Sequence, residues 1–143
     1  MLVALEGASR IAAPGYVRLN EGPIEWIADN TKKGVSTGTA ALTIHARADF
    51  SRAYLEAPRD QVAAILLEAA KPWFGQNVTA WQLHRWRYSK PVLADRPPCI
   101  FTSHPAPLAI AGDAFCGSRL EGAFLSGLAA AERISAVAPQ ALP

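Results

Sequence analysis

The chain contains short apolar or alternating runs and two longer stretches in which apolar residues recur every three or four positions. Short runs bounded by Gly, Pro or Asp are typical of β-strands. They predict strands at residues 2–6, 16–19, 40–46, 78–88, 99–102 and 108–111. Helical spacing places one apolar set on a single helix face: Val62, Ile65, Leu66, Ala69 and Trp73. A second helix face carries Leu120, Phe124, Leu128, Ala131 and Ile134.

Cap signals predict where the helices begin and end. Pro23 suits the first position of a short amphipathic helix over residues 24–28, and Pro58 suits the first position of the next long helix. Asp49 is expected to cap a helical turn, and Gly75 to cap the end of the long helix. The resulting order is strand, helix, strand, helices, strands and helix. This order favours an α+β domain with a mostly antiparallel sheet covered by helices on one side.

The chain is expected to divide near residue 106. Residues 1–106 form the predicted α+β region, residues 107–138 a closing strand and helix, and residues 139–143 a tail. The stretch 78–88 is long, aromatic and partly alternating. We therefore expect it to be a central strand of the sheet.

Composition and charge restrict the class of protein. The chain has 143 residues, half of them apolar, which is enough for a core. Its net charge is only +2 and its Lys and Arg residues are scattered, so no nucleic-acid surface is expected. No apolar run reaches the roughly 18 residues of a membrane span, and the N-terminus lacks the pattern of a signal peptide. We therefore expect a cytoplasmic protein without a membrane partner.

The cysteine and histidine residues do not form a recognisable chemical motif. Cys99 and Cys116 are the two cysteines, and in a cytoplasmic protein they are expected to be free thiols. The three histidines, His45, His84 and His104, are scattered along the chain. None of these residues has the spacing of a zinc site, so no metal is expected.

The most informative stretch is a glycine-rich junction between a predicted strand and the last helix. The apolar run 107–111 ends at Gly112, and a helix follows Gly117. Bare N–H groups at the positive end of a helix suit a phosphate or another electron-rich oxygen. Gly112 and Gly117-Ser118 have the spacing of a Walker A loop but lack its lysine, and the chain has no G-x-G-x-x-G. A plain strand, turn and helix with glycines for tight packing is the alternative.

A family resemblance rests on this junction. Residues 112–134, with Gly112-Asp113 at the start and the motif Glu-Gly-Ala-Phe-Leu-Ser-Gly at 121–127, resemble the C-terminal flavin-binding segment of the flavin-containing amine oxidases, most closely the renalase-like branch. Two further motifs, at residues 26–33 and 84–88, appear in the order of that family, so the resemblance spans about residues 2–134. The family's N-terminal βαβ unit, with the glycine-rich fingerprint that holds the ADP half of FAD, is missing. The chain thus looks like the C-terminal part of such an enzyme.

The resemblance implies FAD as the cofactor and assigns its contacts. These are Gly112, Asp113, Gly117, Arg119, Leu120, Glu121 and Gly122. The N–H groups around Leu120 would stabilise negative charge at the N1–C2=O edge of the flavin, and Asp113 would hydrogen-bond the ribityl or pyrophosphate region. The three glycines would allow close backbone approach. From the residues alone, Asp113 is equally a cap or turn residue and Glu121 a first-turn carboxylate favoured by the helix dipole.

Aromatic residues supply the candidates for the substrate face. In a strand, His84, Trp86 and Tyr88 would share one face and form a wall beside a planar substrate. The alternative is that Trp86 and Tyr88 are core aromatics and the intervening arginines form ion pairs. Trp26 is interpreted as a core residue. Residues 32–39 are rich in turn formers and predict an exposed loop, which the resemblance places near the active-site entrance.

The implied activity is hydride transfer from an amine or dihydropyridine-type substrate to FAD and then to oxygen. The chain is expected to be incomplete for this reaction on its own, and to need a separate dinucleotide-binding chain or region. The alternative is a non-catalytic binding or oligomerisation module derived from the same fold. That module would form a homo-oligomer, because Leu120, Phe124 and Leu128 lack a sheet to cover them.

Overall fold

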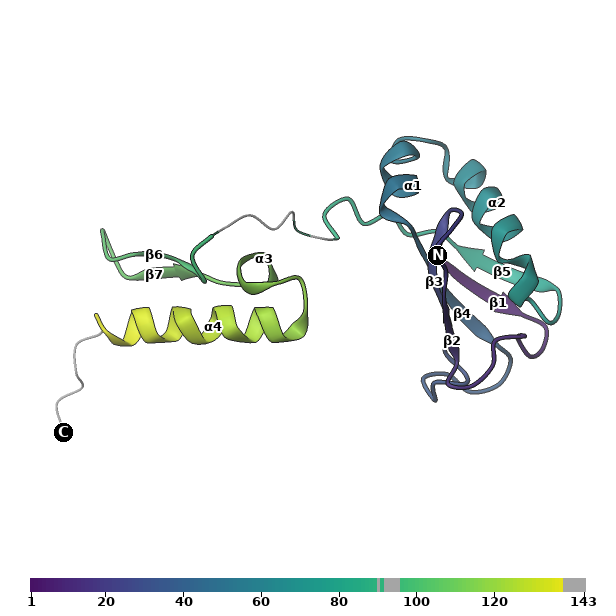
Figure 1. Cartoon of the computed structure of the whole chain (residues 1–143), viewed down its shortest axis with the longest axis horizontal. Helices are drawn as coiled ribbons and strands as arrows, with labels where there is room; N and C mark the ends of the chain where they lie inside the picture. The colour runs from purple at the N-terminus through teal and green to yellow at the C-terminus, as the bar shows by residue number, and fades with distance from the viewer. Residues whose placement is uncertain (90, 92–95, 138–143) are drawn as a thin grey trace. The chain divides into compact units, whose positions relative to one another are not determined.

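The computed structural model describes residues 1–89, 91 and 96–137, which fall into two compact units. Unit 1 comprises Met1–Arg87 and unit 2 comprises Tyr88–Pro143; Figure 1 labels their helices and strands. The division lies before the boundary expected near residue 106. The reason is that strand β6 (Ile100–Thr102) pairs with β7 (Leu108–Ile110), so both strands belong to unit 2.

Unit 1 is built on a five-stranded antiparallel sheet of order β2-β3-β4-β1-β5. Its strands are β1 (Leu2–Leu5), β2 (Tyr16–Arg18), β3 (Ile24–Asp29), β4 (Ala41–Ala46) and β5 (Val78–Gln82). Its helices are α1 (Ala48–Ala53), α2 (Arg59–Ala70) and the short 3-10 helix η1 (Lys71–Trp73). This architecture confirms the predicted α+β class with an antiparallel sheet.

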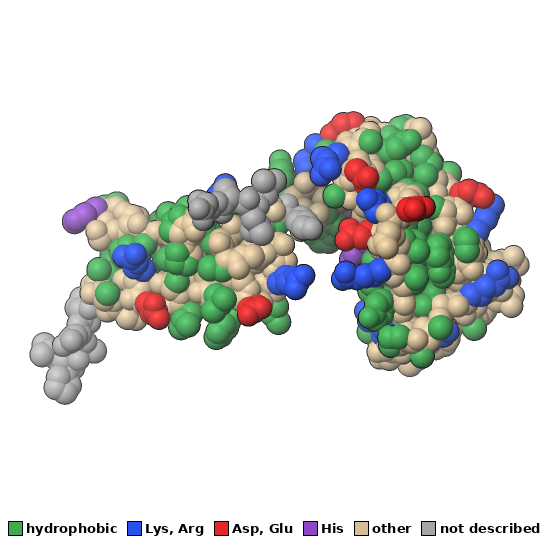
Figure 2. Space-filling view, in the orientation of Figure 1, with side chains coloured by type: hydrophobic (Ala, Val, Ile, Leu, Met, Phe, Trp, Pro, Cys, Tyr) green, Lys and Arg blue, Asp and Glu red, His purple; other side chains and the backbone are tan. Residues whose placement is uncertain are grey.

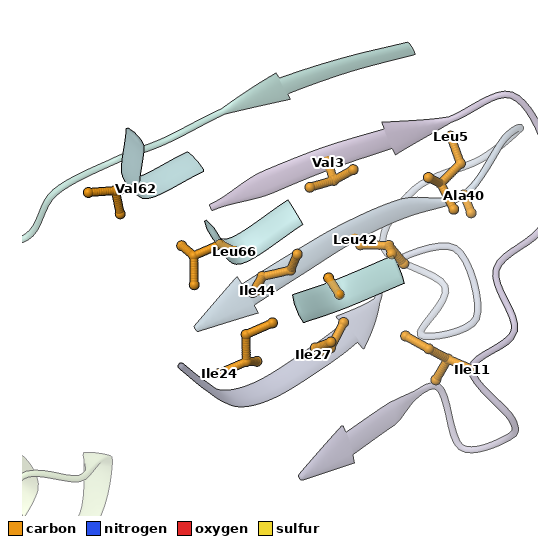
Figure 3. Packing of buried hydrophobic residues seen from close by; sticks show 11 residues of the cluster. Val3, Leu5, Ile11, Ile24, Ile27, Ala40, Leu42, Ile44, Val62 and Leu66 are labelled. Atoms are coloured by element: carbon orange, nitrogen blue, oxygen red, sulfur yellow. The ribbon is translucent and has the colours of Figure 1, made fainter. Parts of the chain in front are cut away.

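One face of the sheet forms the core of unit 1. Alternating residues of the strands point to this face because successive side chains in a strand lie on opposite sides. The fully buried cluster contains Val3, Leu5, Ile11, Ile24, Ile27, Ala40, Leu42, Ile44, Val62, Leu66 and Ala70. Figure 3 shows Leu66 of α2 beside Ile44 of β4, and Val62 belongs to the same buried cluster. Each such large side chain stabilises the fold by about 1.5–3 kcal/mol through burial.

The helix expected at residues 24–28 is instead strand β3. Ile24 and Ile27 are three positions apart, which is a helical spacing, and both are buried. The pairing of β3 with β4 shifts between Ile24 and Trp26, so Glu25 is an extra residue in the strand. This bulge puts Ile24 and Ile27 on the same face of a strand. The spacing of three between these isoleucines therefore comes from a bulged strand and not from the turn of a helix.

Strand β5 differs from the prediction in length and position. It ends at Gln82, and it lies at the edge of the sheet, not at its centre. Trp81, in β5, is 42 % exposed, as expected where one side of a strand has no partner. The aromatic residues after Gln82 therefore do not belong to a strand.

Two predicted caps are also wrong. Asp49 lies inside α1, whose N-cap residue is Arg47, and no side chain caps this helix. Helix α2 ends at Ala70 and continues as η1, so Gly75 does not cap it. Gly75 serves a different purpose, because a Cβ atom there would lie 2.1 Å from the Ala8 carbonyl oxygen. A glycine is required at this position for close backbone approach.

Unit 2 consists of the β6–β7 hairpin, the short helix α3 (Asp113–Cys116) and helix α4 (Leu120–Ser135). Helix α4 contacts both strands of the hairpin. The predicted junction between strand and helix is present, with the single turn of α3 inserted in it. Among the helices of the described residues, none has the length and hydropathy needed to span a membrane.

A buried carboxylate fixes the loop that follows β3. Asp29 is 1 % exposed and accepts a 2.6 Å hydrogen bond from the Ser9 hydroxyl. It also accepts hydrogen bonds from the backbone amides of Thr31, at 2.9 Å, and Lys32, at 3.2 Å. The Lys32 ammonium group in turn donates to the Ile11 carbonyl. These bonds tie the N-terminal segment to the loop at residues 30–39.

The hydrogen bonds also set the ionisation of this group. Burial by itself raises the pKa of Asp29, but the bonds from Ser9 and from the amides of Lys32 and Thr31, with the Lys32 charge, lower the pKa overall. A carboxylate whose folded pKa lies below its unfolded pKa stabilises the fold above the unfolded value. This contribution is lost as the pH falls through the folded pKa.

Replacing Asp29 is expected to destabilise unit 1. Asp29→Ala leaves the Ser9 hydroxyl and two amides without their acceptor, which costs about 1–3 kcal/mol at pH 7. The difference from the parent chain should stay constant above about pH 5 and shrink below about pH 4. Urea unfolding followed by tryptophan fluorescence measures it, because all four tryptophans lie in unit 1. A difference that grows on acidification would contradict the assigned role.

Candidate functional site

The N-terminus of α4 presents free backbone amides. Arg119 is the N-cap residue, and no side chain caps the helix. The Arg119 amide donates to the Gly117 carbonyl at 2.8 Å. Within the described part of the chain, the amides of Leu120, Glu121 and Gly122 have no acceptor. The positive end of a helix of 16 residues therefore has three amides without an acceptor: those of Leu120 and Glu121, which are exposed residues, and that of Gly122, which is buried.

The glycines of this junction hold the turn against the helix. Gly117 has a φ of 117°, which favours glycine. A Cβ atom on Gly122 would lie 2.0 Å from the Gly117 carbonyl oxygen and 2.8 Å from the Cys116 carbonyl carbon. The close approach that Gly122 allows is thus made by this chain's own backbone. This is the tight packing that the sequence offered as the alternative to ligand approach.

Ser126 is a residue of this segment that the sequence did not single out. It lies one helical turn after Gly122 and is fully buried. Its hydroxyl donates to the Pro98 carbonyl at 2.6 Å and accepts from the Gly112 amide at 3.0 Å. One side chain therefore ties α4 to the chain before β6 and after β7. In the sequence, the spacing of the small residues Gly122 and Ser126, four positions apart on one helix face, indicates a place where another segment can approach the helix backbone closely.

The acidic candidates of the segment are exposed. Asp113 lies in the first turn of α3, and Gly112, not Asp113, occupies the N-cap position. Glu121 lies in the first turn of α4, where the helix dipole favours a carboxylate. The sequence and structure thus place both carboxylates on the surface, within reach of solvent or a ligand.

Unit 2 has no apolar core of its own among its described residues. Cys99 is the one hydrophobic side chain there that is buried. Leu120, Phe124 and Leu128 of α4 are 89 %, 68 % and 49 % exposed. Figure 2 shows hydrophobic side chains along the outer surface of α4. On the hairpin, Ile100, Leu108 and Ile110 are also about half exposed.

The aromatic residues 84–88 do not form the predicted wall. The rings of His84 and Trp86 are 4.5 Å apart, and Trp86 is 72 % exposed. Tyr88 is 94 % exposed and falls on the other side of the unit boundary. The alternative that Trp86 and Tyr88 are core aromatics is wrong as well. The ion pair that it included does exist, between Arg87 and Glu56 at 2.6 Å.

Trp26 is not a core residue either, because it lies on the sheet face opposite α2. Its ring centroid is 5.0 Å from that of His45 and 6.4 Å from that of Tyr16. The Lys33 ammonium lies 5.4 Å from the Trp26 ring centroid. A cluster of aromatic and cationic side chains therefore exists on unit 1, apart from the residues that the sequence assigned to the cofactor and the substrate face.

In the described residues, a metal site or a disulfide would have to be formed by Cys, His, Asp and Glu side chains. No three His, Cys, Asp or Glu side chains come together there in a way that would hold a metal ion. Cys99 and Cys116 are free thiols. No protein-family model matches the sequence. The resemblance to the amine oxidases therefore enters the function as a proposal.

The packing of Gly122 makes a testable prediction with a matched control. Gly122→Ala should destabilise α4, because its Cβ atom meets backbone at 2.0 Å. Gly127→Ala, in the same helix, has no atom within 4 Å and should stabilise the helix by up to about 1 kcal/mol. Thermal unfolding followed by far-ultraviolet circular dichroism compares the two. Equal effects of both substitutions would show that the turn does not pack on Gly122.

Proposed function

We propose that the chain supplies the sheet region and the closing strand and helix of an FAD-dependent oxidoreductase of the renalase-like amine oxidase type. A dinucleotide-binding region, in the same protein or in a separate chain, completes the cofactor site. The reaction takes a hydride from an amine or dihydropyridine-type substrate and passes the electrons to oxygen. The proposed enzyme is cytoplasmic.

The observation that carries the proposal is the missing core of unit 2. Among the described residues of unit 2, Cys99 is the one buried hydrophobic side chain, and the largest apolar side chains of α4 and the hairpin are exposed to solvent. The exposed hydrophobic side chains of α4 and of the hairpin form the kind of surface that another layer of a domain covers. In the family that the sequence resembles, this layer is the sheet of the dinucleotide-binding domain. The structure of unit 2 fits such an addition.

The N-terminus of α4 suits the cofactor's chemistry. FAD, when bound, supplies hydride acceptance at its N5 atom. The free amides of Leu120, Glu121 and Gly122 are donors that suit the electron-rich N1–C2=O edge. Their direction is fixed before any ligand arrives, because Gly122 and Ser126 hold the helix on the turn and hairpin. Asp113 is proposed to accept hydrogen bonds from the ribityl or pyrophosphate region.

A second function is suggested by the same exposed hydrophobic side chains of α4 and the hairpin. If two copies of the chain cover each other's Phe124 and Leu128, the chain is a non-catalytic assembly module. Such a module needs no flavin and no second kind of chain. Its oligomeric state then separates the two proposals.

The cofactor proposal is tested by titration with FAD. The chain is titrated alone and together with the dinucleotide-binding region of a renalase-like enzyme, and flavin absorbance and fluorescence are recorded. We expect a perturbed flavin spectrum at least in the combined sample. Asp113→Ala should weaken the affinity about tenfold, the loss of one charge-assisted hydrogen bond. Glu132→Ala, near the other end of α4, is the matched control and should leave the affinity unchanged.

Two results would contradict this assignment. One is the absence of both flavin binding and complex formation in the combined sample. The other is an equal loss of affinity in the Asp113 and Glu132 variants. Either result would leave the assembly module as the better account.

The oligomeric state is measured by size-exclusion chromatography with light scattering. The assembly module predicts a dimer or larger species for the chain alone. Phe124→Ser, at a position 68 % exposed, should then shift it to monomer without loss of helical circular dichroism. The oxidoreductase proposal predicts that the same substitution prevents association with the dinucleotide-binding region. A monomer that associates with nothing, in both the parent and the variant, would contradict both proposals.

A further inference from the structure

The outer face of the unit 1 sheet, opposite α2, carries a row of aromatic and cationic side chains. Arg18 of β2 is paired with Trp26 of β3, and Trp26 is paired with His45 of β4. Directly paired residues lie on the same side of a sheet, so the three side chains form one row across it. Tyr16 lies beside this row, on β2. Arg18, Trp26, His45 and Tyr16 are all absent from the hydrophobic core.

Next to this row the face is made of small side chains. Ala4 is paired with both Ala41 and Ala80, and Leu2 is paired with Thr43. Ala4, Ala41, Ala80 and Thr43 form a low floor beside the taller aromatic rings, whereas Ala28, paired with Thr43, is fully buried. Leu2 and Tyr16, at the borders of the floor, are each 49 % exposed. No helix of the described part of unit 1 covers this face.

Around this face the cations Arg18, Lys33 and the N-terminal ammonium outnumber the one acidic group that acts on His45, Glu25. Lys33 holds its ammonium 5.4 Å from the Trp26 ring centroid, and Arg18 projects from the same side of the sheet. Burial lowers the pKa of His45, and the N-terminal ammonium and Lys33 act in the same direction against Glu25. His45 is therefore a neutral ring at pH 7, and Arg18 and Lys33 carry the charge. Glu25, the bulge residue, is the acidic group next to His45.

The loop that carries Lys33 is held in place. The Asp29 carboxylate accepts hydrogen bonds from the backbone amides of Thr31 and Lys32. The Lys33 amide donates to the Asp29 carbonyl at 3.1 Å. Asn30 donates from its side chain to the Thr43 hydroxyl at 2.9 Å, on the floor itself. The cation is thus presented by a loop fixed at both the buried and the outer side of the sheet. A preorganised cation binds an anion with less ordering entropy than a free side chain.

We propose that this face binds a flat aromatic molecule that carries a carboxylate or phosphate group. The ring lies on the floor formed by Ala41 and Thr43, in contact with the Trp26 ring. The anionic group pairs with Lys33 and Arg18. This site goes beyond the proposed oxidoreductase function, because it belongs to unit 1 alone and requires no flavin.

The arrangement selects against other occupants. A cationic amine would meet Lys33 and Arg18 as like charges, whereas an anion relieves their repulsion. Aliphatic anions would gain the charge interaction without the contact to Trp26 and Tyr16. Offset or edge-to-face packing with these rings requires an aromatic partner. Lys33 and Arg18 alone are too few cations for a nucleic-acid backbone.

The test uses two ligands with the same ring and opposite charge. Indole-3-acetate and tryptamine are titrated up to about 10 mM into the ¹⁵N-labelled full chain, and amide and indole N–H shifts are followed by NMR. Indole-3-acetate is expected to shift the signals of Trp26, Ala41 and Thr43, with an affinity at least tenfold higher than that of tryptamine. Absence of these shifts, or equal affinity of the two ligands, would overturn the proposal. Shifts of the same signals on concentrating the protein alone would assign the face to a second copy of the chain instead.

Variants of the full chain locate the site. Trp26→Leu should weaken indole-3-acetate binding about tenfold, and Lys33→Gln, which keeps the length of the side chain, about threefold. Trp81→Leu is the matched control, because Trp81 pairs with the core residue Val3 and so belongs to the other face of the sheet. If Trp26→Leu changes the NMR signals of the whole unit, the protein has lost its fold, and the affinity of the Lys33→Gln variant is then the test of the site. Unchanged affinity in Lys33→Gln, or an equal loss in Trp81→Leu, would refute the assignment.

Discussion

The exposed apolar side chains of α4 and of the β6–β7 hairpin need another surface to remove them from water. This need is the constraint on which both proposed functions of unit 2 depend. Unit 1 satisfies the same requirement internally, because α2 packs its apolar side chains on one face of the sheet. Unit 2 pairs a two-stranded hairpin with one long helix, and a hairpin of this size is marginal without further layers. Among its described residues, the fully buried contacts to α4 are made by the Ser126 hydroxyl and the Gly122 backbone, while its apolar side chains other than Cys99 are at least partly exposed. Its apolar residues are therefore available to another surface.

The contacts of Gly122 and Ser126 explain how a small unit can still present a defined helix end. The glycine lets the turn at residues 116–117 rest on the first turn of α4, and the serine fixes the next turn to the hairpin. Donors at a helix N-terminus stabilise negative charge best when their direction is fixed before the ligand arrives. A segment that lacks an apolar core but has a rigid helix end is well suited to complete a site on a larger domain. This is the physical reason for preferring the cofactor proposal to a purely structural account.

The sequence predicted most strands, the two longer helices and the antiparallel α+β class, because these depend on local periodicity and burial. It failed where tertiary context changed the meaning of a local pattern. The bulge at Glu25 made a strand look helical, and the edge position of β5 left residues 83–88 without a partner strand. Gly75 was interpreted as a cap, although its role is a contact with Ala8 that no local pattern reveals. At the candidate site, the glycines were found by their spacing, while Ser126 and the cluster around Trp26 depend on pairings between distant segments.

The two candidate sites differ in how they attract negative charge. The N-terminus of α4 uses backbone amides and a helix dipole, which bind without a titrating group and change little with pH. The outer face of the sheet uses Lys33 and Arg18 beside aromatic rings, so its attraction is carried by side chains and is screened by salt where it is exposed. The first arrangement suits a group that must be held in one orientation while its charge changes. The second suits recognition of a flat anion whose charge is constant, and the two therefore need not serve the same ligand.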